Sequence, residues 1–336
     1  MWPIYSRKYK MRNMPNGILI LVLIVFCSLV FVFLNLQPIT VDSSLGPHWT
    51  TGTSMPRSLF EVSATVLNGR IYVAGGQDEK GDLQDTLFVY DPRSGKWDLE
   101  STLPVALDHS ALASYDNKLY LAGGFLQHRI TTPQLFIYDP ETKLWQEGEP
   151  MPTARAGLTS QFVDGILYAI GGSSGDNTGA LGINEAYDPR TNSWTEKDPM
   201  PTNRHHISST IIEGAIIVIG GRVTGVPSSL DIIQEYYPKN NSWVELAPMP
   251  TKRSGVAAVT VEGNVYVMGG EKISGSYSKL EKYDPKSDSW TVEPDMPTAR
   301  LGLDAVNLDD KIYAIGGKTS QSSKSATNAS EIFYPY

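Results

Sequence analysis

Six positions, spaced about 48 residues apart, each carry either a reactive side chain or glycine. Each lies six residues after a Met-Pro or Leu-Pro dipeptide, and they read Glu61, His109, Gly157, His206, Gly255 and Gly302. A carboxylate beside an imidazole can move protons as an acid–base pair. Two imidazoles and a carboxylate also form a ligand set for a metal ion such as zinc. Polar side chains at the edges of loops are the third interpretation, and the sequence leaves all three open.

A second set of equivalent positions carries four arginines. Four residues after the same dipeptides the sequence has Leu59, Leu107, Arg155, Arg204, Arg253 and Arg300. A guanidinium group can bind a carboxylate through two parallel hydrogen bonds. We therefore predict a partial ring of arginines that binds an anionic group, with His206 and Arg222 as further ligand-binding residues. Hydrogen bonds from these arginines to the backbone of nearby loops are the alternative.

These positions belong to a repeat that fills most of the chain. Each repeat has four β-rich segments, as in residues 255–261, 264–268, 280–283 and 289–292. A double glycine follows the second segment, and a Tyr-x-Pro motif and a tryptophan follow the glycines. The double glycines begin at Gly75, Gly123, Gly171, Gly220, Gly269 and Gly316, and the tryptophans are Trp49, Trp97, Trp145, Trp194, Trp243 and Trp290. The sequence thus predicts six antiparallel sheets of four strands each.

The pattern resembles the kelch repeat, and the resemblance covers Trp49 to Tyr336. It implies an all-β, six-bladed kelch-type β-propeller whose blades surround a central channel. Trp49 has no double glycine before it, and the last repeat ends before its own tryptophan. We therefore predict that a strand at 48–53 completes the sixth blade beside a strand at 330–333. The loops of variable length and the six aligned positions that carry Glu, His or Gly fall on one face, which we predict to be the working face.

The N-terminal part differs from the rest of the chain. Four basic residues precede an apolar run, from Ile18 to Leu34, that is long enough to span a bilayer. Positive charges flanking such a span stay on the cytoplasmic side. We therefore predict a cytoplasmic segment (1–17), one transmembrane helix acting as a signal anchor (18–36), a linker (37–46) and an extracytoplasmic propeller (47–336). A cleaved signal peptide, which would release a secreted propeller, is the alternative.

Composition excludes several classes of function. The net charge is −8, although four basic residues lie in the first segment, so the propeller is acidic and we expect no nucleic-acid partner. Cys27 is the single cysteine, which excludes an intramolecular disulfide and a cysteine zinc site. Because Cys27 lies in the predicted anchor, the propeller also lacks the Tyr-Cys cross-link of the copper radical oxidases built on kelch-type propellers. The chain has no P-loop, and no nucleophile elbow in a strand-to-helix setting.

Two functions from different classes fit these observations. The first is a membrane-anchored, monomeric binding module without cofactor or metal, whose arginines recognise an anionic group of a protein or glycan partner. The second is a carbohydrate-active enzyme similar to the kelch-type sialic acid mutarotases. In that enzyme the arginines would bind the sugar carboxylate, and Glu61 with His109 or His206 would move protons. A purely structural component of the cell envelope is a third possibility.

Overall fold

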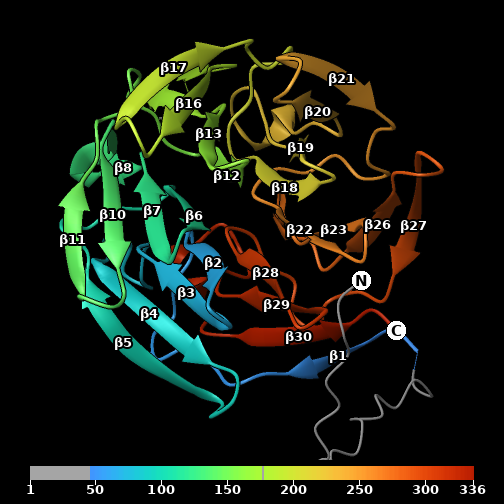
Figure 1. The fold of residues 1–336 in the computed structure, drawn as a ribbon. Coiled ribbons are helices and arrows are strands. Elements are labelled where there is room, and N and C mark those ends of the chain that lie inside the picture. Colours follow the sequence, from blue (N-terminus) through green and yellow to red (C-terminus); the bar gives the residue numbers. More distant parts are fainter. Residues whose placement is uncertain (1–45, 176–177) are drawn as a thin grey trace, which may run out of the picture. The chain divides into compact units, whose positions relative to one another are not determined.

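The computed structural model describes residues 46–175 and 178–336, which form a six-bladed β-propeller (Figure 1). Each blade is an antiparallel sheet of four strands, so the predicted all-β ring is confirmed. The predicted cytoplasmic segment (1–17), the anchor (18–36) and the linker up to residue 45 lie outside the described residues. Within the described ranges, no helix is long and apolar enough to cross a membrane.

The four strands of each blade follow one another in sequence from the channel to the rim, except in the last blade. Blade 1 contains β2 (Ser63–Leu67), β3 (Arg70–Ala74), β4 (Thr86–Asp91) and β5 (Lys96–Thr102). Blade 2 contains β6 (Ala111–Tyr115), β7 (Lys118–Ala122), β10 (Leu135–Asp139) and β11 (Leu144–Glu147). Blade 3 contains β12 (Thr159–Val163), β13 (Ile166–Ile170), β16 (Asn184–Asp188) and β17 (Ser193–Lys197).

The second half of the ring repeats this order. Blade 4 contains β18 (Ser208–Ile212), β19 (Ala215–Ile219), β20 (Ile233–Tyr237) and β21 (Ser242–Leu246). Blade 5 contains β22 (Ala257–Val261), β23 (Asn264–Met268), β26 (Leu280–Asp284) and β27 (Ser289–Glu293). Blade 6 contains β28 (Asp304–Leu308), β29 (Lys311–Ile315), β30 (Ser330–Tyr334) and, from the other end of the chain, β1 (His48–Thr51).

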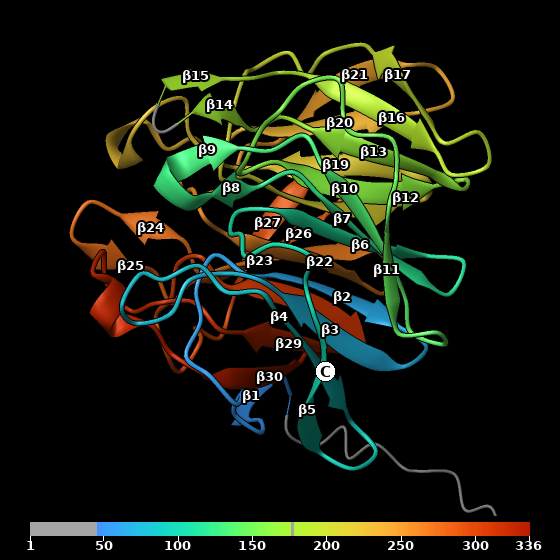
Figure 2. The same ribbon diagram turned by 90° about the vertical axis from the view of Figure 1, so that its left-hand side faces the viewer.

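The connections between second and third strands carry short additional elements. Three of them are two-stranded hairpins: β8 (Phe125–Leu126) with β9 (Ile130–Thr131), β14 (Ser173–Gly175) with β15 (Thr178–Ala180), and β24 (Glu271–Lys272) with β25 (Gly275–Ser276). The others are the 3₁₀ turns η2 (Gln127–Arg129), η3 (Val226–Ser228) and η4 (Ser323–Ser325). The three hairpins lie on the same side of the propeller (Figure 2). This side is the face on which the variable loops are expected.

The double glycines allow neighbouring blades to approach closely. Gly75 and Gly76 both have a positive φ, which most other residues adopt at a cost. A Cβ atom on Gly75 would lie 2.5 Å from the carbonyl oxygen of Leu107, where the next blade begins. A larger residue would therefore push two blades apart.

The repeated tryptophans connect the outer strand of one blade to the blade before it. Trp97 donates its Nε1–H to the carbonyl oxygen of Thr53 at 2.9 Å, and Trp290 donates to that of Ala247 at 3.0 Å. Each tryptophan also packs against the aromatic residue on the adjacent strand, with ring centroids between 4.9 and 5.2 Å apart. These contacts explain why both aromatic residues recur in every repeat.

The ring closes as predicted. Strand β1 pairs with β30 in antiparallel register, with Trp49 opposite Phe333. The two ends of the described propeller therefore share one sheet, and blade 6 has no missing outer strand.

Deleting residues 47–54 is expected to destabilise the whole propeller. The deletion removes the ladder between β1 and β30 and exposes Phe333, which is fully buried. Because loss of a large aromatic contact in a core costs about 3–5 kcal/mol, we expect the free energy of unfolding to fall by at least about 3 kcal/mol. Urea unfolding of the full-length chain measures this effect, with Val292→Ala on an exposed outer strand as the control. An unfolding curve that matches the wild type would contradict closure by β1.

Candidate functional site

The channel contains a cavity of about 400 Å³. The innermost strand of every blade contributes to its walls, and hydroxyl side chains such as Ser110, Thr159 and Thr210 line it. Its volume lies within the range of small-molecule sites. The cavity thus suits a small hydrophilic ligand better than an apolar one.

One end of this cavity is encircled by a closed ring of backbone hydrogen bonds. One residue of each blade takes part, and its N–H donates to the carbonyl oxygen of the equivalent residue in the preceding blade. The six N···O distances lie between 2.7 and 3.3 Å. The members of the ring are Glu61, His109, Gly157, His206, Gly255 and Gly302. These are the six positions that the repeat aligns, so the sequence located the ring residues but not their hydrogen bonds.

The ring forces a left-handed backbone on all six residues. Their φ angles lie between 52° and 63°, which glycine adopts without strain. Glu61, His109 and His206 adopt them with a side chain attached, at a conformational cost that glycine does not have. Three blades therefore use the residue that suits the backbone, and three use a reactive residue in its place.

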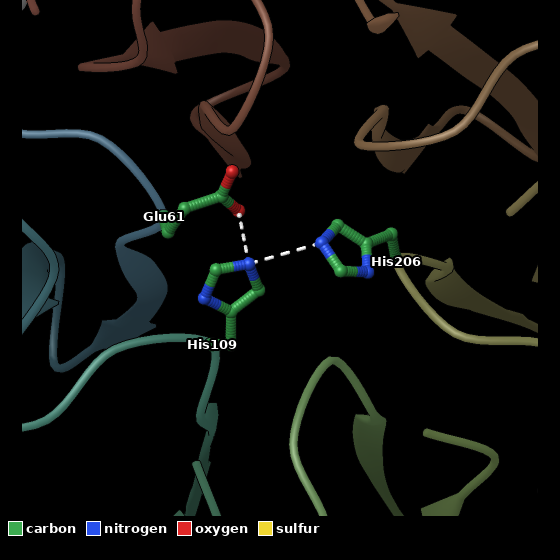
Figure 3. Close-up of side chains that lie close together, drawn as sticks. All are labelled: Glu61, His109 and His206. Atoms are coloured by element: carbon green, nitrogen blue, oxygen red, sulfur yellow. Dashed lines mark hydrogen bonds and ion pairs between the residues drawn. The ribbon is translucent and has the colours of Figure 1, made fainter. Parts of the chain in front are cut away.

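The three reactive side chains meet near the channel axis (Figure 3). His109 Nε2 lies 3.0 Å from His206 Nε2 and 3.3 Å from Glu61 Oε2. All three residues line the cavity, although each side chain is largely buried. A carboxylate and two imidazoles are thus in contact at a position that a ligand in the channel can reach.

Glycines in the other blades make room for this cluster. A Cβ on Gly302 would lie 2.7 Å from Glu61 Oε1. A Cβ on Gly157 would lie 3.3 Å from His206 Nδ1. The glycines are therefore part of the site, because they let the side chains of blades 1 and 4 extend over them.

A buried carboxylate holds the far side of His109. Asp108 is fully buried, and its Oδ1 lies 3.0 Å from His109 Nδ1. Arg129 lies 3.6 Å from Asp108 Oδ2, and Gln77 donates a hydrogen bond to the same oxygen. These contacts fix the imidazole so that its Nε2 faces the channel axis.

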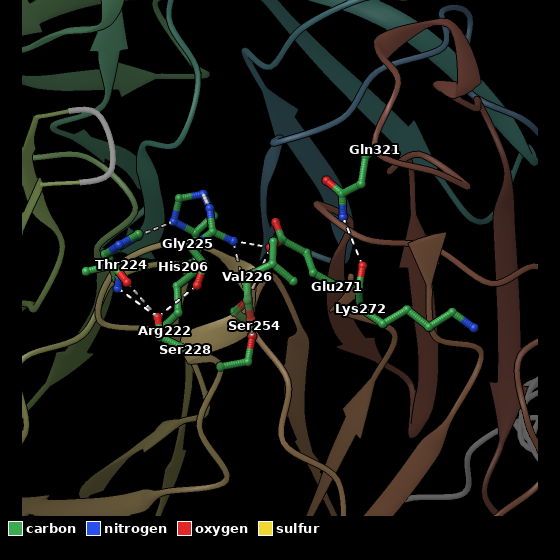
Figure 4. A network of polar contacts seen from close by, with 12 residues as sticks. His206, Arg222, Thr224, Gly225, Val226, Ser228, Ser254, Glu271, Lys272 and Gln321 are labelled. Carbon is green, nitrogen blue, oxygen red and sulfur yellow. Dashed lines mark hydrogen bonds and ion pairs between the residues drawn. The ribbon is translucent and has the colours of Figure 1, made fainter. Parts of the chain in front are cut away.

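A polar network holds His206 from the side of blades 4 and 5 (Figure 4). His206 Nδ1 lies 2.5 Å from His205 Nδ1, and Arg222 Nη2 lies 2.9 Å from His206 Nε2. Arg222 is buried and also pairs with Glu271, which accepts a hydrogen bond from Ser254 at 3.2 Å. Arg222 thus contacts His206, the other predicted ligand-binding residue, but it does so as a buried residue inside a network.

The electrostatic surroundings push the two facing histidines in opposite directions. Burial alone would lower the pKa of His109, but the carboxylates of Glu61 and Asp108 outweigh it and raise that pKa above its ordinary value. Burial lowers the pKa of His206 well below its ordinary value, and the positive charges of Arg222 and His109 lower it further. The cluster therefore holds a proton-rich imidazole beside a proton-poor one.

The same three residues could hold a metal ion. Glu61, His109 and His206 each offer one ligand atom, and these atoms lie within 4.8 Å of one another. The three residues of the metal interpretation from the sequence therefore lie together in the structure.

The four predicted anion-binding arginines do not face the channel. Arg155, Arg204, Arg253 and Arg300 are fully buried, and they hydrogen bond to backbone carbonyl oxygens and to a polar side chain on the third strand of their own blade. Their side-chain partners are Glu185, Gln234, Glu281 and Glu331, respectively. Their expected position at the channel mouth is therefore wrong, and the alternative of bonding to the backbone describes them better.

Blades 1 and 2 show what these arginines replace. They have Leu59 and Leu107 at the arginine position and Phe88 and Phe136 at the position of the acidic partner. Each Leu and Phe belong to one hydrophobic cluster. A blade therefore has arginine at this position when Glu or Gln occupies the facing position on its third strand. It has leucine when Phe occupies that facing position. That pairing is visible in the sequence and would have identified the arginines as structural.

Asp304 is a titratable group in the channel wall outside the cluster. It accepts hydrogen bonds from the backbone N–H of Ala64 at 2.7 Å and of Ala305 at 2.8 Å, and burial raises its pKa to about 6. Because the folded state then binds a proton more tightly than the unfolded state, we expect stability to fall as the pH rises from about 4 to about 6.

The expected loss is about 1–3 kcal/mol, since part of the residue remains exposed to the channel. Urea unfolding of the wild type and of Asp304→Asn at pH 4, 5, 6 and 7 measures it. As the pH rises from 4 to 6, the free energy of unfolding of the wild type should fall relative to that of Asp304→Asn. Parallel pH profiles would contradict the elevated pKa.

Comparisons with known proteins agree with this architecture. A family profile described as the KLHDC2/KLHL20/DRC7 Kelch-repeats domain matches residues 109–317, and a Kelch motif profile matches residues 59–104. Kelch-like protein 35 of Homo sapiens is 29% identical over 52 residues, which are 16% of this chain and 9% of that protein. A solved structure described as "Structure of YjhT" superposes with a TM-score of 0.73 at 16% identity and covers 84% of this chain and 96% of that one. The structural likeness concerns the fold alone.

Proposed function

We propose, since the chain belongs to the kelch-repeat family of propellers, that it is a carbohydrate-active enzyme with its site at Glu61, His109 and His206. One observation carries the proposal. At three of six equivalent ring positions a reactive side chain occupies a left-handed backbone that glycine occupies elsewhere, and the middle one of these side chains, His109, contacts the other two. Glycine adopts this backbone without strain, and the proposal attributes the three exceptions to chemistry.

The reaction that suits this site is the exchange of anomers of a sugar. The anomeric hydroxyl loses its proton, the bond between the anomeric carbon and the ring oxygen breaks, and the ring oxygen gains a proton. The reverse steps on the other face of the carbonyl group give the second anomer. The isomerisation needs one group that accepts a proton and one that donates it, and no electrons are gained or lost.

The contacts of the cluster support one role for each residue in this proposal. Glu61 is the group that takes the proton, because its carboxylate faces the channel and His109. His109 is the group that gives it, because Asp108 and Glu61 both favour its charged form. His206, beside the positive charge of Arg222, stays neutral, and its contact with His109 across 3.0 Å orients the imidazole that gives the proton.

Two partly exposed cations on the loop face suit a substrate with a carboxylate. Arg129, 35% exposed, lies beside Asp108 and above the ring of Phe125, with its guanidinium carbon 3.9 Å from the ring centroid. Lys318 lies 4.1 Å from the centroid of Phe60, the residue before Glu61. These cations therefore flank the Glu61–His109 pair. They take the place of the four buried arginines in the proposal.

Rates of anomeric exchange test the proposed function. We would measure them by NMR for sialic acid and for glucose as a neutral sugar, with full-length protein. We expect faster exchange of the carboxylated sugar, with a higher KM in Arg129→Ala. Exchange of both sugars at the uncatalysed rate would refute this enzyme and return the chain to the binding module of the sequence analysis.

A further inference from the structure

His109 Nε2 lies at metal-site spacing from a ligand atom of His206 and from one of Glu61, and all three atoms lie within 4.8 Å of one another. In a tetrahedral zinc site, bonds of about 2.0–2.1 Å place neighbouring ligand atoms about 3.3 Å apart. His109 Nε2 lies 3.0 Å from His206 Nε2 and 3.3 Å from Glu61 Oε2. Two histidines and one glutamate are also a known ligand set of catalytic zinc, which leaves a fourth position open.

We propose that Glu61, His109 and His206 together bind one divalent transition-metal ion of the zinc class. The ion uses the lone pair of each Nε2 and one carboxylate oxygen, and these atoms belong to the three residues of the proposed enzyme site. Metal binding and sugar exchange therefore compete for the same residues. Resting on the proposed function, this competition makes the metal a reversible inhibitor of anomeric exchange.

The contacts behind the ligands support the assignment. Metal-binding histidines usually donate their second ring N–H to a carboxylate or another acceptor, which orients the ligand nitrogen. Asp108 Oδ1 lies 3.0 Å from His109 Nδ1, and His205 Nδ1 lies 2.5 Å from His206 Nδ1. On the ring nitrogen that faces away from the proposed ion, His206 thus has a hydrogen-bond contact with His205, and His109 has the Asp108 carboxylate at ion-pair distance.

Arg222 opposes the metal and sets its affinity. Its Nη2 lies 2.9 Å from His206 Nε2, the atom that the ion needs. When the ion binds, Arg222 must give up this contact, but it keeps Glu271 and the neighbouring Ser254. A positive charge at this distance weakens binding of a second cation. We therefore expect a reversible site rather than a permanently occupied one.

The first experiment measures binding of Zn²⁺ to full-length protein by competition with a chromophoric chelator. We expect one ion per chain, and an affinity lower by about 10–100-fold in Asp108→Asn, which removes the charge behind His109. Glu61→Gln and His109→Gln should lose more than that. His128→Ala, an exposed histidine outside the cluster, is the matched control and should bind like the wild type.

A double variant tests the opposing role of Arg222. Arg222→Gln with Glu271→Gln removes both charges of the buried pair and so leaves neither group unpaired. We expect this variant to bind Zn²⁺ more tightly than the wild type. Co²⁺ in place of Zn²⁺ reports the geometry, because a tetrahedral site gives intense visible absorption.

The outcomes separate this inference from the proposed function. Absence of stoichiometric Zn²⁺ binding, or equal affinity in the wild type, His109→Gln and Asp108→Asn, overturns the metal site whatever the turnover. Exchange activity in chelator-treated protein that falls as Zn²⁺ is added supports both proposals. Zn²⁺ binding by a protein that exchanges no sugar supports the metal site and refutes the enzyme. Activity that Zn²⁺ binding leaves unchanged overturns the competition.

Discussion

Arg253→Ala is expected to lower the free energy of unfolding by about 3–5 kcal/mol. Arg253 is fully buried, and its guanidinium lies 2.7 Å from the carboxylate of Glu281 and 2.7 Å from the carbonyl oxygen of Gly269. Removing it leaves Glu281 as a buried charge without its cation, and this is the usual cost of breaking such a pair. Urea unfolding of the purified variant measures the loss.

The chain supplies its own control for this prediction. Replacing Arg253 with leucine and Glu281 with phenylalanine copies the arrangement of Leu107 and Phe136 in blade 2. Because apolar residues of similar volume can replace a buried ion pair at little cost, the double variant should recover most of the stability that Arg253→Ala loses. Equal losses in the two variants would show that the backbone contacts of Arg253, rather than its charge pair, stabilise the blade.

The fold could be predicted from the sequence because its signals are steric and repeat in every blade. A double glycine is required where blades approach, as at Gly75, and a tryptophan is required where an outer strand bonds to the preceding blade. Closure by β1 followed from the incomplete first and last repeats. These features depend on local spacing, which the sequence displays directly.

The site could be predicted only in part because its geometry depends on the size of the ring. Glu61, His109 and His206 were identified by departing from glycine at equivalent positions, yet their contact requires blades 2 and 4 to approach across Gly157. The pairing of Asp108 with His109 likewise depends on how the chain turns into β6. Position in the repeat alone does not show that the four arginines are buried. Their burial becomes evident only when each arginine is compared with the Glu or Gln opposite it in the same blade.

Glu61→Gln is expected to reduce the rate of anomeric exchange by about 10²–10⁴-fold. The amide keeps the shape of the side chain but cannot take a proton, and general acid–base catalysis contributes a factor of this size. Its fold should be unchanged, since the backbone hydrogen bonds of Glu61 in the ring do not involve the side chain. NMR exchange rates measured with the wild type and the variant at equal concentration give the ratio.

His206→Gly separates a catalytic cause from a structural one. Glycine already occupies the equivalent position in three blades with the same backbone hydrogen bonds. Relief of the strained φ of His206 therefore offsets the contacts that its ring loses, and we expect the free energy of unfolding to change by less than about 1 kcal/mol. Exchange activity should fall together with that of Glu61→Gln. A variant that loses several kcal/mol of stability and keeps its activity would show that His206 holds the channel together and has no part in the exchange.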